Sequence, residues 1–301
     1  MNFFSPLNAR GPTGVRSSSV VSSGRPSGNV LVTIPAHNEA KFLTEAVRRV
    51  RTALVAHGVP FVLSIAEDGS TDASPQILSE LRAEYPDLLV RSVPRKLGRG
   101  RALRELWTTV DAAVYAFIDA DLASDPQYLL RAIDLVRGGG DVAIGSRYAS
   151  GAVVSRPPLR STVSQAYNWL LRTLLNDDIR DHQCGLKALS RPVVRTVLPL
   201  ATEDSWFWDS EILVLAVRNG FKVAEFPVVW REMKNDRTGV SRLLSDLLIH
   251  GSGIIRLLDE VDRASSASRT APSRSHIPAP SEPSDGSDLP LDLPVGDRIE
   301  G

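Results

Sequence analysis

The segment from Phe117 to Asp121 places two carboxylates one residue apart, directly after a run of hydrophobic residues. A carboxylate pair at the end of a buried strand can converge on one hard divalent cation once the chain leaves the extended conformation. A cation held there would bridge the oxygens of a diphosphate and offset their charge. Asp119 and Asp121, with Ala120 between them, are therefore candidate ligands for Mg2+ or Mn2+. The alternative is that both carboxylates only cap the following turn.

A second acidic segment follows the hydrophobic run at residues 61–66. Asp68 lies where a carboxylate can accept hydrogen bonds from a base or a ribose, and Gly69 lets the backbone turn. Residues 70–72 can cap the next helix. The segment P-A-H-N-E at 35–39 also follows a hydrophobic run, and a tight strand-to-helix turn with Asn38 as the cap would explain it.

Two basic segments offer groups that bind phosphate. Arg147 follows the hydrophobic run at 141–144, and an arginine at a strand end presents two parallel N–H donors to a phosphate. Residues 95–101 gather basic side chains around two glycines, which suits a loop or helix start that approaches a diphosphate. Solvated surface arginines are the alternative in both cases. Neither segment is a Walker loop, and the absence of G-x-G-x-x-G after a strand argues against dinucleotide binding.

These polar groups need strands and helices to position them, and the hydrophobic pattern predicts both. Short apolar runs at 29–34, 61–66, 88–93, 114–118 and 141–144 predict buried strands. Helical spacing follows at 43–54 and 128–136, with Asn38 and Asp125 as caps. Alternating strands and helices predict an α/β fold with a mostly parallel sheet flanked by helices. Ligands of such sheets bind at the carboxyl ends of the strands.

The composition is that of a soluble globular protein. The 301 residues include 35 basic and 35 acidic ones, so net charge gives no indication of a nucleic-acid partner. Hydrophobic residues make up 43% and charged residues 23%. The single cysteine, Cys184, excludes an intrachain disulfide and a multi-cysteine zinc site, and we interpret it as a small buried hydrophobic residue.

Residues 1–28 and 263–301 are rich in Ser, Pro and Gly and are predicted to be disordered, which leaves one ordered domain at 29–262. No apolar stretch reaches the roughly 18 to 20 residues of a spanning helix. The best candidate, 243–258, is interrupted by polar residues. It predicts an amphipathic helix that lies either on a membrane surface or against the domain.

Taken together, these segments resemble the catalytic domain of glycosyltransferase family 2, which implies a GT-A-type, Rossmann-like fold. Three later blocks narrow the resemblance to the dolichyl-phosphate glucosyltransferases and dolichyl-phosphate mannose synthases: R-D-H-Q-C-G-L-K at 180–187, W-F-W-D-S-E at 206–211 and A-E-F-P-V-V-W at 224–230. The resemblance covers roughly residues 29–258. Several short blocks in the right order make this family assignment specific.

The resemblance implies a nucleotide-sugar donor, a polyprenyl or dolichyl phosphate acceptor and a role for each matching residue. Asp119 and Asp121 would hold the metal, and with Arg147 and Arg160 they form the predicted catalytic set. Arg156 competes with Arg160 for its position. The predicted acceptor-phosphate residues are Arg147, Arg160, Arg237 and Arg242. The predicted donor-binding residues are Pro35, Ala36, Glu39, Asp68, Arg99, Ala120, Asp181, Gln183, Asp209 and Glu211.

The chain departs from the family pattern at three places. The mannose synthase pattern D-A-D-x-Q would supply a third metal ligand, whereas Ala123 stands there, so water or donor phosphate must fill the position. The late R-x-x-G-x-S-K block is one residue shorter and ends in Arg242. Glucosyltransferase relatives commonly carry an added membrane segment, and we expect none here.

The implied reaction is inverting transfer of a hexose to a lipid phosphate, with UDP-glucose favoured by the blocks at 180–187 and 206–211. A phosphate oxygen is already anionic near neutral pH and needs no general base. We expect peripheral attachment at the cytoplasmic face of the cell membrane, alone or through a membrane-anchoring partner protein. One alternative is a soluble enzyme of the same fold that transfers to a hydroxyl, with Asp204 or Asp209 as base. The other is an inactive nucleotide-sugar-binding protein, which Ala123 and the long tails would favour.

Overall fold

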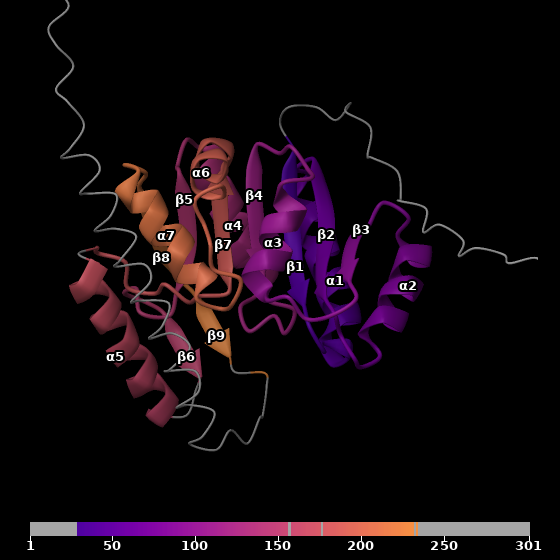
Figure 1. The fold of residues 1–301 in the computed structure, drawn as a ribbon, viewed down its shortest axis with the longest axis horizontal. Coiled ribbons are helices and arrows are strands. Elements are labelled where there is room, and N and C mark those ends of the chain that lie inside the picture. The colour runs from indigo at the N-terminus through magenta and orange to yellow at the C-terminus, as the bar shows by residue number, and fades with distance from the viewer. Residues whose placement is uncertain (1–28, 156–157, 176, 232, 234–301) are drawn as a thin grey trace, which may run out of the picture. The chain divides into compact units, whose positions relative to one another are not determined.

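The computed structural model describes residues 29–155, 158–175, 177–231 and 233 (Figure 1). Within α5 the side chains of residues 158–161, 163 and 175 are not described either. Several predictions lie outside the described residues: the disordered ends at 1–28 and 263–301, the amphipathic helix at 243–258, and the residues Arg156, Arg237 and Arg242.

A seven-stranded sheet forms the centre of the fold, with strands in the order β3-β2-β1-β4-β7-β5-β8 (Figure 1). β7 runs antiparallel to β4 and β5, and the other neighbouring pairs are parallel. A separate parallel pair joins β6 to β9. The strands are β1 (Val30–Ala36), β2 (Phe61–Asp68), β3 (Leu89–Val93), β4 (Val114–Ile118), β5 (Val142–Ser146), β6 (Val153–Ser155), β7 (Leu186–Ser190), β8 (Val223–Pro227) and β9 (Val229–Arg231).

Helices cover both faces of the large sheet and bury two separate hydrophobic cores. One core takes residues from α1, α2 and α4, and the other takes residues from α3, α6 and α7. α5 packs through a smaller cluster against α7. The helices are α1 (Ala40–His57), α2 (Ser74–Glu84), α3 (Arg99–Trp107), α4 (Pro126–Arg137), α5 (Pro158–Leu175), α6 (Arg191–Val197) and α7 (Trp208–Arg218).

The central strand β1 shows why its sequence is apolar at every position except Thr33, whose hydroxyl is hydrogen-bonded to that of Ser64 on β2. Val30, Val32 and Ile34 point into the first core, whereas Leu31 points into the second. A strand between two helical layers has no solvent face, so hydrophobic residues follow one another without alternation. The prediction of an α/β fold with a mostly parallel sheet is confirmed.

The five predicted strands are present, and three of them continue further than predicted. β1 extends to Ala36, β2 to Asp68 and β5 to Ser146. In β2 and β5, polar residues expected beyond the strand are therefore its last residues. β7 and β8 were not predicted. β7 is short and carries Lys187, which is fully buried on a strand in the middle of the sheet. A lysine in a five-residue segment hides the apolar pattern that a buried strand normally shows.

One predicted helix cap is confirmed and one is wrong. Asp125 caps α4, and its carboxylate accepts a hydrogen bond from the N–H of Gln127. Asn38 does not cap α1, because its side chain accepts bonds from the N–H groups of Thr71 and Asp72 instead. Asp72 in turn accepts from the N–H of Ala40, so its loop caps α1. The two loops at the ends of β1 and β2 are therefore fixed to each other.

Among the described residues, no helix has both the length and the apolar character needed to cross a membrane.

Candidate active site

Asp119 and Asp121 lie immediately after Ile118, the last residue of β4, at the carboxyl end of a strand near the middle of the sheet. The N–H of Asp119 donates to the carbonyl oxygen of Gly185. Leu122 has a positive φ of 47°, and the Asp121 carboxylate accepts a bond from the N–H of Ala123. The chain thus turns sharply at this point, and the turn keeps both carboxylates at the strand end.

Gly185 is required where it stands because the Asp119 side chain lies against its backbone. A Cβ added to Gly185 would lie 1.8 Å from Asp119 Oδ2, far inside contact distance. The buried Lys187 stabilises this turn by donating from Nζ to the carbonyl oxygen of Cys184 at 2.6 Å. Sequence reasoning missed both roles, although both residues lie in the block that carries the family resemblance.

Arg99, from the first turn of α3, is the cationic partner of Asp119. Its Nη1 donates to Asp119 Oδ1, and its Nε lies 3.4 Å from Asp209 Oδ2 on α7. The guanidinium is stacked between the rings of Trp206 and Phe117, at 4.6 and 5.0 Å from their centroids. The Arg99 side chain is only 6% exposed, whereas that of Asp119 is 31% exposed. Arg99 is therefore paired with the carboxylates of Asp119 and Asp209. This pairing differs from the expectation that Arg99 faces a phosphate.

The charges in this cluster support one another. Burial would lower the pKa of Arg99, but Asp119 and Asp209 raise it above its ordinary value. The Nη2 of Arg99 and the Oδ1 of Asp209 are buried and have no hydrogen-bond partner. Such unsatisfied polar atoms are rare in protein interiors and concentrate where function needs them. Trp206, which is half exposed over Arg99, is a further site residue that the sequence did not single out.

The residues present fit a hard divalent cation in part. Asp119 and Asp121 supply carboxylate oxygens, which Mg2+ and Mn2+ prefer. Among the described residues, no third His, Cys, Asp or Glu completes a metal-binding group. Ala123, at the place of the glutamine in the related pattern, is buried, and its carbonyl oxygen accepts a bond from Arg231. The remaining ligand positions would therefore fall to water and to a bound diphosphate.

The predicted nucleotide residues lie at the ends of β1 and β2. Pro35 and Ala36 are buried within β1, and Glu39 precedes α1 as its N-terminal flanking residue. Asp68 is buried, and its two oxygens accept bonds from the N–H groups of Leu97 and Gly98, at 2.6 and 2.9 Å. Asp68 thus positions the loop before α3, which differs from the predicted contact with a base or ribose.

Arg147 and Asp181 form a buried bidentate ion pair. Arg147 Nε donates to Asp181 Oδ2 at 2.8 Å, and Nη2 donates to Oδ1 at 2.7 Å. The Arg147 backbone N–H adds a third bond to Oδ2. The guanidinium also contacts the rings of Tyr148 and Trp230. Burial opposes ionisation of Asp181, yet Arg147 keeps the pKa of that carboxyl below its ordinary value.

This pairing changes the expected roles of both residues. Asp181 is fully buried and bound to Arg147, so it does not present a carboxylate to a sugar hydroxyl. Arg147 is 9% exposed and satisfies its guanidinium inside the protein rather than on an acceptor phosphate. The pair instead joins the end of β5 to the segment before β7.

Among the remaining predicted residues, some side chains are described by the structure and others are not. Glu211 is buried, and its carboxylate accepts bonds from the N–H groups of Thr202 and Glu203, so it stabilises a loop rather than a sugar. Burial raises the pKa of Glu211. Gln183 is half-buried, between Asp181 and Gly185. Ala120 is buried beside the two metal-ligand candidates. Arg160 belongs to α5, but its side chain lies outside the described residues, as do Arg237 and Arg242.

Comparison with known proteins identifies the family. Residues 31–198, more than half of the chain, match Glycosyl transferase family 2. The chain belongs to glycosyltransferase family 2. The prediction made from the motifs is thereby confirmed.

Three relatives illustrate the position of the chain within glycosyltransferase family 2. Glycosyltransferase AglD of Haloferax volcanii is 41% identical over 231 residues, which cover 75% of this chain but only 36% of AglD. Polyprenol monophosphomannose synthase of Mycolicibacterium smegmatis is 32% identical, covering 73% of this chain and 82% of the relative. Dolichyl-phosphate beta-glucosyltransferase of Saccharomyces cerevisiae is 27% identical, with 72% of each chain covered.

Solved structures confirm the GT-A-type fold that the family membership implies. Glucosyl-3-phosphoglycerate synthase from Mycobacterium tuberculosis, in complex with Mn2+, UDP-glucose and phosphoglyceric acid, superposes with a TM-score of 0.59. The sequences are 20% identical, and the superposition covers 77% of this chain and 80% of the synthase. At that identity the likeness establishes the fold alone.

Proposed function

We propose that this protein transfers a hexose, favouring glucose from UDP-glucose, to a polyprenyl or dolichyl phosphate with inversion at the sugar. The observation that carries the proposal is the pair Asp119 and Asp121 at the carboxyl end of β4, with Arg99 bound to the first of them. Relatives named dolichyl-phosphate beta-glucosyltransferase and polyprenol monophosphomannose synthase support a lipid phosphate as the acceptor.

Asp119 and Asp121 would bind the metal ion together with the donor diphosphate. Mg2+ or Mn2+ bound there supplies positive charge at the oxygens of the departing diphosphate. Arg99 would keep Asp119 oriented, because Arg99 is itself fixed by Asp209 and by the rings of Phe117 and Trp206. The metal-bearing complexes of the Mycobacterium tuberculosis synthase support a divalent cation for this fold.

The acceptor chemistry favours a phosphate over a hydroxyl. A hydroxyl acceptor needs a general base, and the two candidates were Asp204 and Asp209. Asp204 is bound by Arg104, and its carbonyl oxygen accepts the N–H of Gly100 at the start of α3. Asp209 is buried beside Arg99. Since both carboxylates are committed to arginines, an acceptor that is already anionic suits this site best.

Positioning of the acceptor falls to the arginines near α5 and in the late block. Arg160 would contact the acceptor phosphate, and Arg237 and Arg242 stay predictions for the same role. Arg147 would act through Asp181 by fixing the end of β5. Pro35, Ala36 and Gln183 stay predictions for the donor pocket. A lipid acceptor requires contact with a membrane, which we place at its cytoplasmic face.

A donor and acceptor screen tests the proposal. Purified protein would be incubated with Mn2+ or Mg2+, radiolabelled UDP-glucose or GDP-mannose, and either polyprenyl phosphate or a panel of saccharides. We expect label from UDP-glucose to enter the organic phase only when polyprenyl phosphate is present. Label in an aqueous saccharide product would support hydroxyl transfer instead, and nucleotide-sugar binding without turnover would support an inactive binding protein.

A further inference from the structure

Trp206, in the loop that leads into α7, is a large aromatic side chain that the protein leaves half exposed. It is 53% exposed, whereas its neighbours Phe207 and Trp208 are fully buried. Its indole is covered on one side by the guanidinium of Arg99, which lies 4.6 Å from the ring centroid. The rest of the ring surface is accessible. Aromatic side chains at the edge of a binding site commonly provide the apolar surface on which a ligand packs.

The loop that carries Trp206 is fixed at both ends. The carbonyl oxygen of Asp204 accepts the N–H of Gly100 at 2.9 Å, which holds the loop against the start of α3. A Cβ added to Gly98 would lie 2.1 Å from the same carbonyl oxygen, so the two segments are in close contact. The Glu211 carboxylate accepts two backbone N–H groups at the beginning of the loop. The indole is thus held in place before a ligand binds, and such preorganisation lowers the entropy cost of binding.

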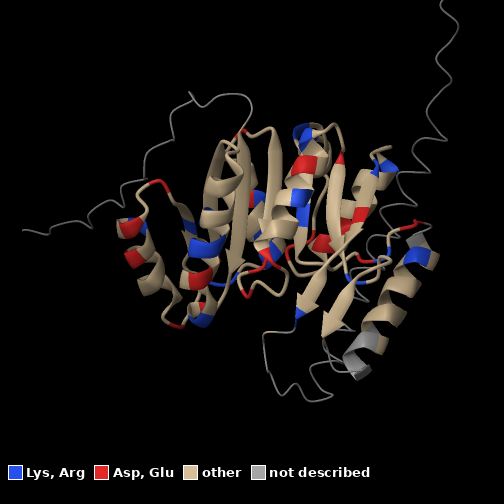
Figure 2. Cartoon of the chain, turned by 180° about the vertical axis from the view of Figure 1, so that it is seen from behind, with Lys and Arg blue, Asp and Glu red and all other residues tan. Residues whose placement is uncertain are grey.

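The indole also borders the candidate metal ligands. The Arg99 guanidinium that packs on Trp206 binds Asp119 through Nη1. The Asp119 side chain is 31% exposed, so two groups that contact one guanidinium, the carboxylate and the indole, are both accessible. Acidic and basic segments come together among these central loops (Figure 2). A diphosphate held at Asp119 and Asp121 would therefore carry its hexosyl group within reach of Trp206.

A hexose suits this surface chemically. The axial C–H groups of a glucopyranose ring form apolar faces, and its hydroxyl groups lie around the rim. C–H groups are attracted to the electron-rich face of an aromatic ring, and their contact removes apolar surface from water. An indole can thus bind the uncharged sugar while charged side chains bind the diphosphate.

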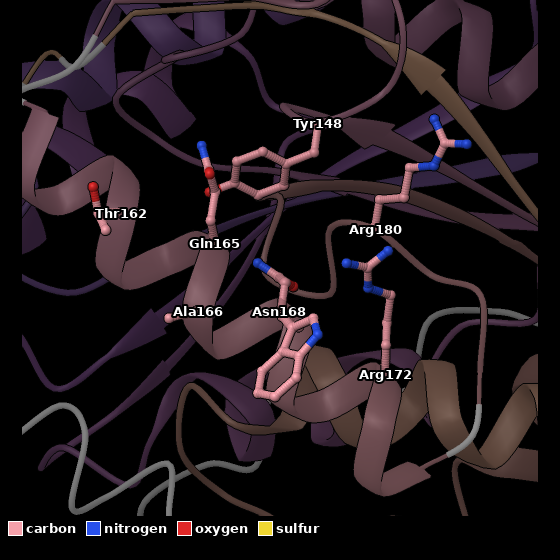
Figure 3. A pocket seen from close by; sticks show the side chains of 8 residues that line it. Tyr148, Thr162, Gln165, Ala166, Asn168, Arg172 and Arg180 are labelled. Atoms are coloured by element: carbon pink, nitrogen blue, oxygen red, sulfur yellow. The ribbon is translucent and has the colours of Figure 1, made fainter.

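A separate pocket beside α5 does not fit a metal-bound donor (Figure 3). It has a volume of about 810 Å3 and is lined by Arg172 and Arg180 together with amide and aromatic side chains. Among the described residues that line it, none is a carboxylate and none belongs to the loop before α7. The pocket therefore offers no carboxylate ligand to a cation. Trp169, which lines this pocket and is 60% exposed, provides a matched control for Trp206.

We propose that Trp206 is a specificity-determining residue that packs against the hexosyl group of the nucleotide-sugar donor. The inference rests on the proposed function, which takes a nucleotide sugar as the donor. It supplies a contact with the sugar that two of the predicted donor residues do not provide. Asp181 is bound to Arg147, and the Glu211 carboxylate is bound to backbone N–H groups.

A purely structural role for the indole predicts a different result. In that case Trp206 would only hold Arg99 in place through its cation–π contact. Removing the indole would then disturb Asp119, and the binding of UDP and UDP-glucose would weaken alike because both carry the diphosphate. A contact with the sugar predicts that only the binding of UDP-glucose weakens.

Isothermal titration calorimetry of the full chain with Mn2+ therefore compares UDP with UDP-glucose. We expect Trp206→Ala to weaken UDP-glucose binding about 10-fold and to change the Kd of UDP by less than about twofold. Trp206→Leu, which keeps an apolar cover over Arg99, should behave in the same way. Trp206→Phe should retain most of the affinity for UDP-glucose, because it keeps an aromatic face. Trp169→Ala should bind both ligands like the unmodified protein.

Tryptophan fluorescence supplies a second readout. The chain has five tryptophans, and a sugar packed on Trp206 should change the emission more with UDP-glucose than with UDP. This difference should disappear in Trp206→Phe and persist in Trp169→Phe. Circular dichroism and thermal melting of each variant check that the fold is retained.

These binding measurements need no acceptor, so they are judged separately from the proposed function. If the unmodified protein does not glycosylate polyprenyl phosphate, the proposed function fails, and the comparison of UDP with UDP-glucose still decides the role of Trp206. GDP and GDP-mannose are measured in parallel. A selective loss of GDP-mannose binding in Trp206→Ala would support the contact with a mannosyl donor and contradict the preference for glucose.

Several results would overturn the inference. Equal losses of UDP and UDP-glucose affinity in Trp206→Ala would show a structural role, and unchanged affinity for both nucleotide sugars would show no contact with the hexose. In a transfer assay, Trp206→Ala should raise the KM for the donor and leave the KM for the acceptor unchanged. A rise confined to the KM for the acceptor would assign the indole to the acceptor. An unmodified protein that binds neither nucleotide sugar would contradict both the inference and the proposed function.

Discussion

Arg147 and Asp181, which are 34 residues apart in sequence, meet in a buried bidentate ion pair with N–O distances of 2.8 and 2.7 Å. The pair joins the carboxyl end of β5 to the segment that leads into β7, and that segment continues to Gly185 beside Asp119. Two residues that the sequence suggested for direct contact with ligands therefore support the turn that carries Asp119 and Asp121.

Removing the negative partner of this pair should lower the free energy of unfolding. Asp181→Asn leaves the Arg147 guanidinium buried without its charge partner, which typically costs about 3–5 kcal/mol. Urea unfolding at pH 7 measures the change. A matched substitution at an exposed ion pair, Glu84→Gln with Arg48 at the surface, should cost at most about 1 kcal/mol.

The same pair should make stability depend on pH in a defined direction. The folded protein holds the pKa of Asp181 below its ordinary value of 3.8, so the stabilisation is complete above that pH and is lost as the pH falls through the folded value. Asp181→Asn has no such titration. The gap in unfolding free energy between the two proteins should therefore narrow from pH 7 to pH 3, and a gap that stays constant would contradict the ionised pair.

Gly185→Ala should directly disturb the turn that carries Asp119 and Asp121. The added Cβ would lie 1.8 Å from Asp119 Oδ2, so the carboxylate or the backbone must move. A displacement of about 1 Å at a reacting centre can cost about 100-fold in rate. We expect that loss in a glycosyl-transfer assay with saturating Mn2+. Gly138→Ala, at an ordinary negative φ after α4, should retain activity, since its nearest neighbour would be 3.2 Å away.

Arg99 and Asp209 should be energetically coupled. Arg99→Met leaves two carboxylates near each other without their cation, and Asp209→Asn removes one of those carboxylates. The double variant should therefore lose less stability than the two single variants together, with a coupling of about 0.5–3 kcal/mol in urea unfolding. Strictly additive losses would show that Arg99 does not hold the two side chains as one unit.

Cys184 should be unreactive in the folded protein. The thiol is 1% exposed, and burial raises its pKa to about 12. At pH 8 we expect no reaction with a disulfide reagent until denaturant unfolds the chain, when one thiol per molecule should react. Rapid reaction in buffer would place Cys184 at an accessible surface.

The fold and the position of Asp119 and Asp121 could be predicted because they depend on local sequence. Val114 to Ile118 is a continuous hydrophobic run, so the end of β4 and the position of Asp119 and Asp121 follow from it. The partners of those residues could not be predicted in the same way. Arg99 is bound to Asp119 across 20 residues, and hydrogen bonds at such separations are set by tertiary packing.

The dependence on tertiary packing also explains why several polar residues have other contacts than the sequence predicted. The carboxylates of Asp68 and Glu211 each accept hydrogen bonds from backbone N–H groups of a loop elsewhere in the chain. No sequence motif predicts these bonds. Asn38 has the residue type of a helix cap, but its side chain binds the loop after β2. β7 was missed because Lys187 interrupts its apolar pattern, and its ammonium group is satisfied by the carbonyl of Cys184.

The most direct test of the account measures how transfer of glucose from UDP-glucose to polyprenyl phosphate depends on Mn2+ and on the pair at the end of β4. We predict that the unmodified protein needs the added cation, and that Asp119→Asn and Asp121→Asn each lower the rate at least about 100-fold while the thermal melting of Asp121→Asn is unchanged. Transfer at the full rate by Asp121→Asn, or in excess chelator, would contradict the assignment of this pair to the metal.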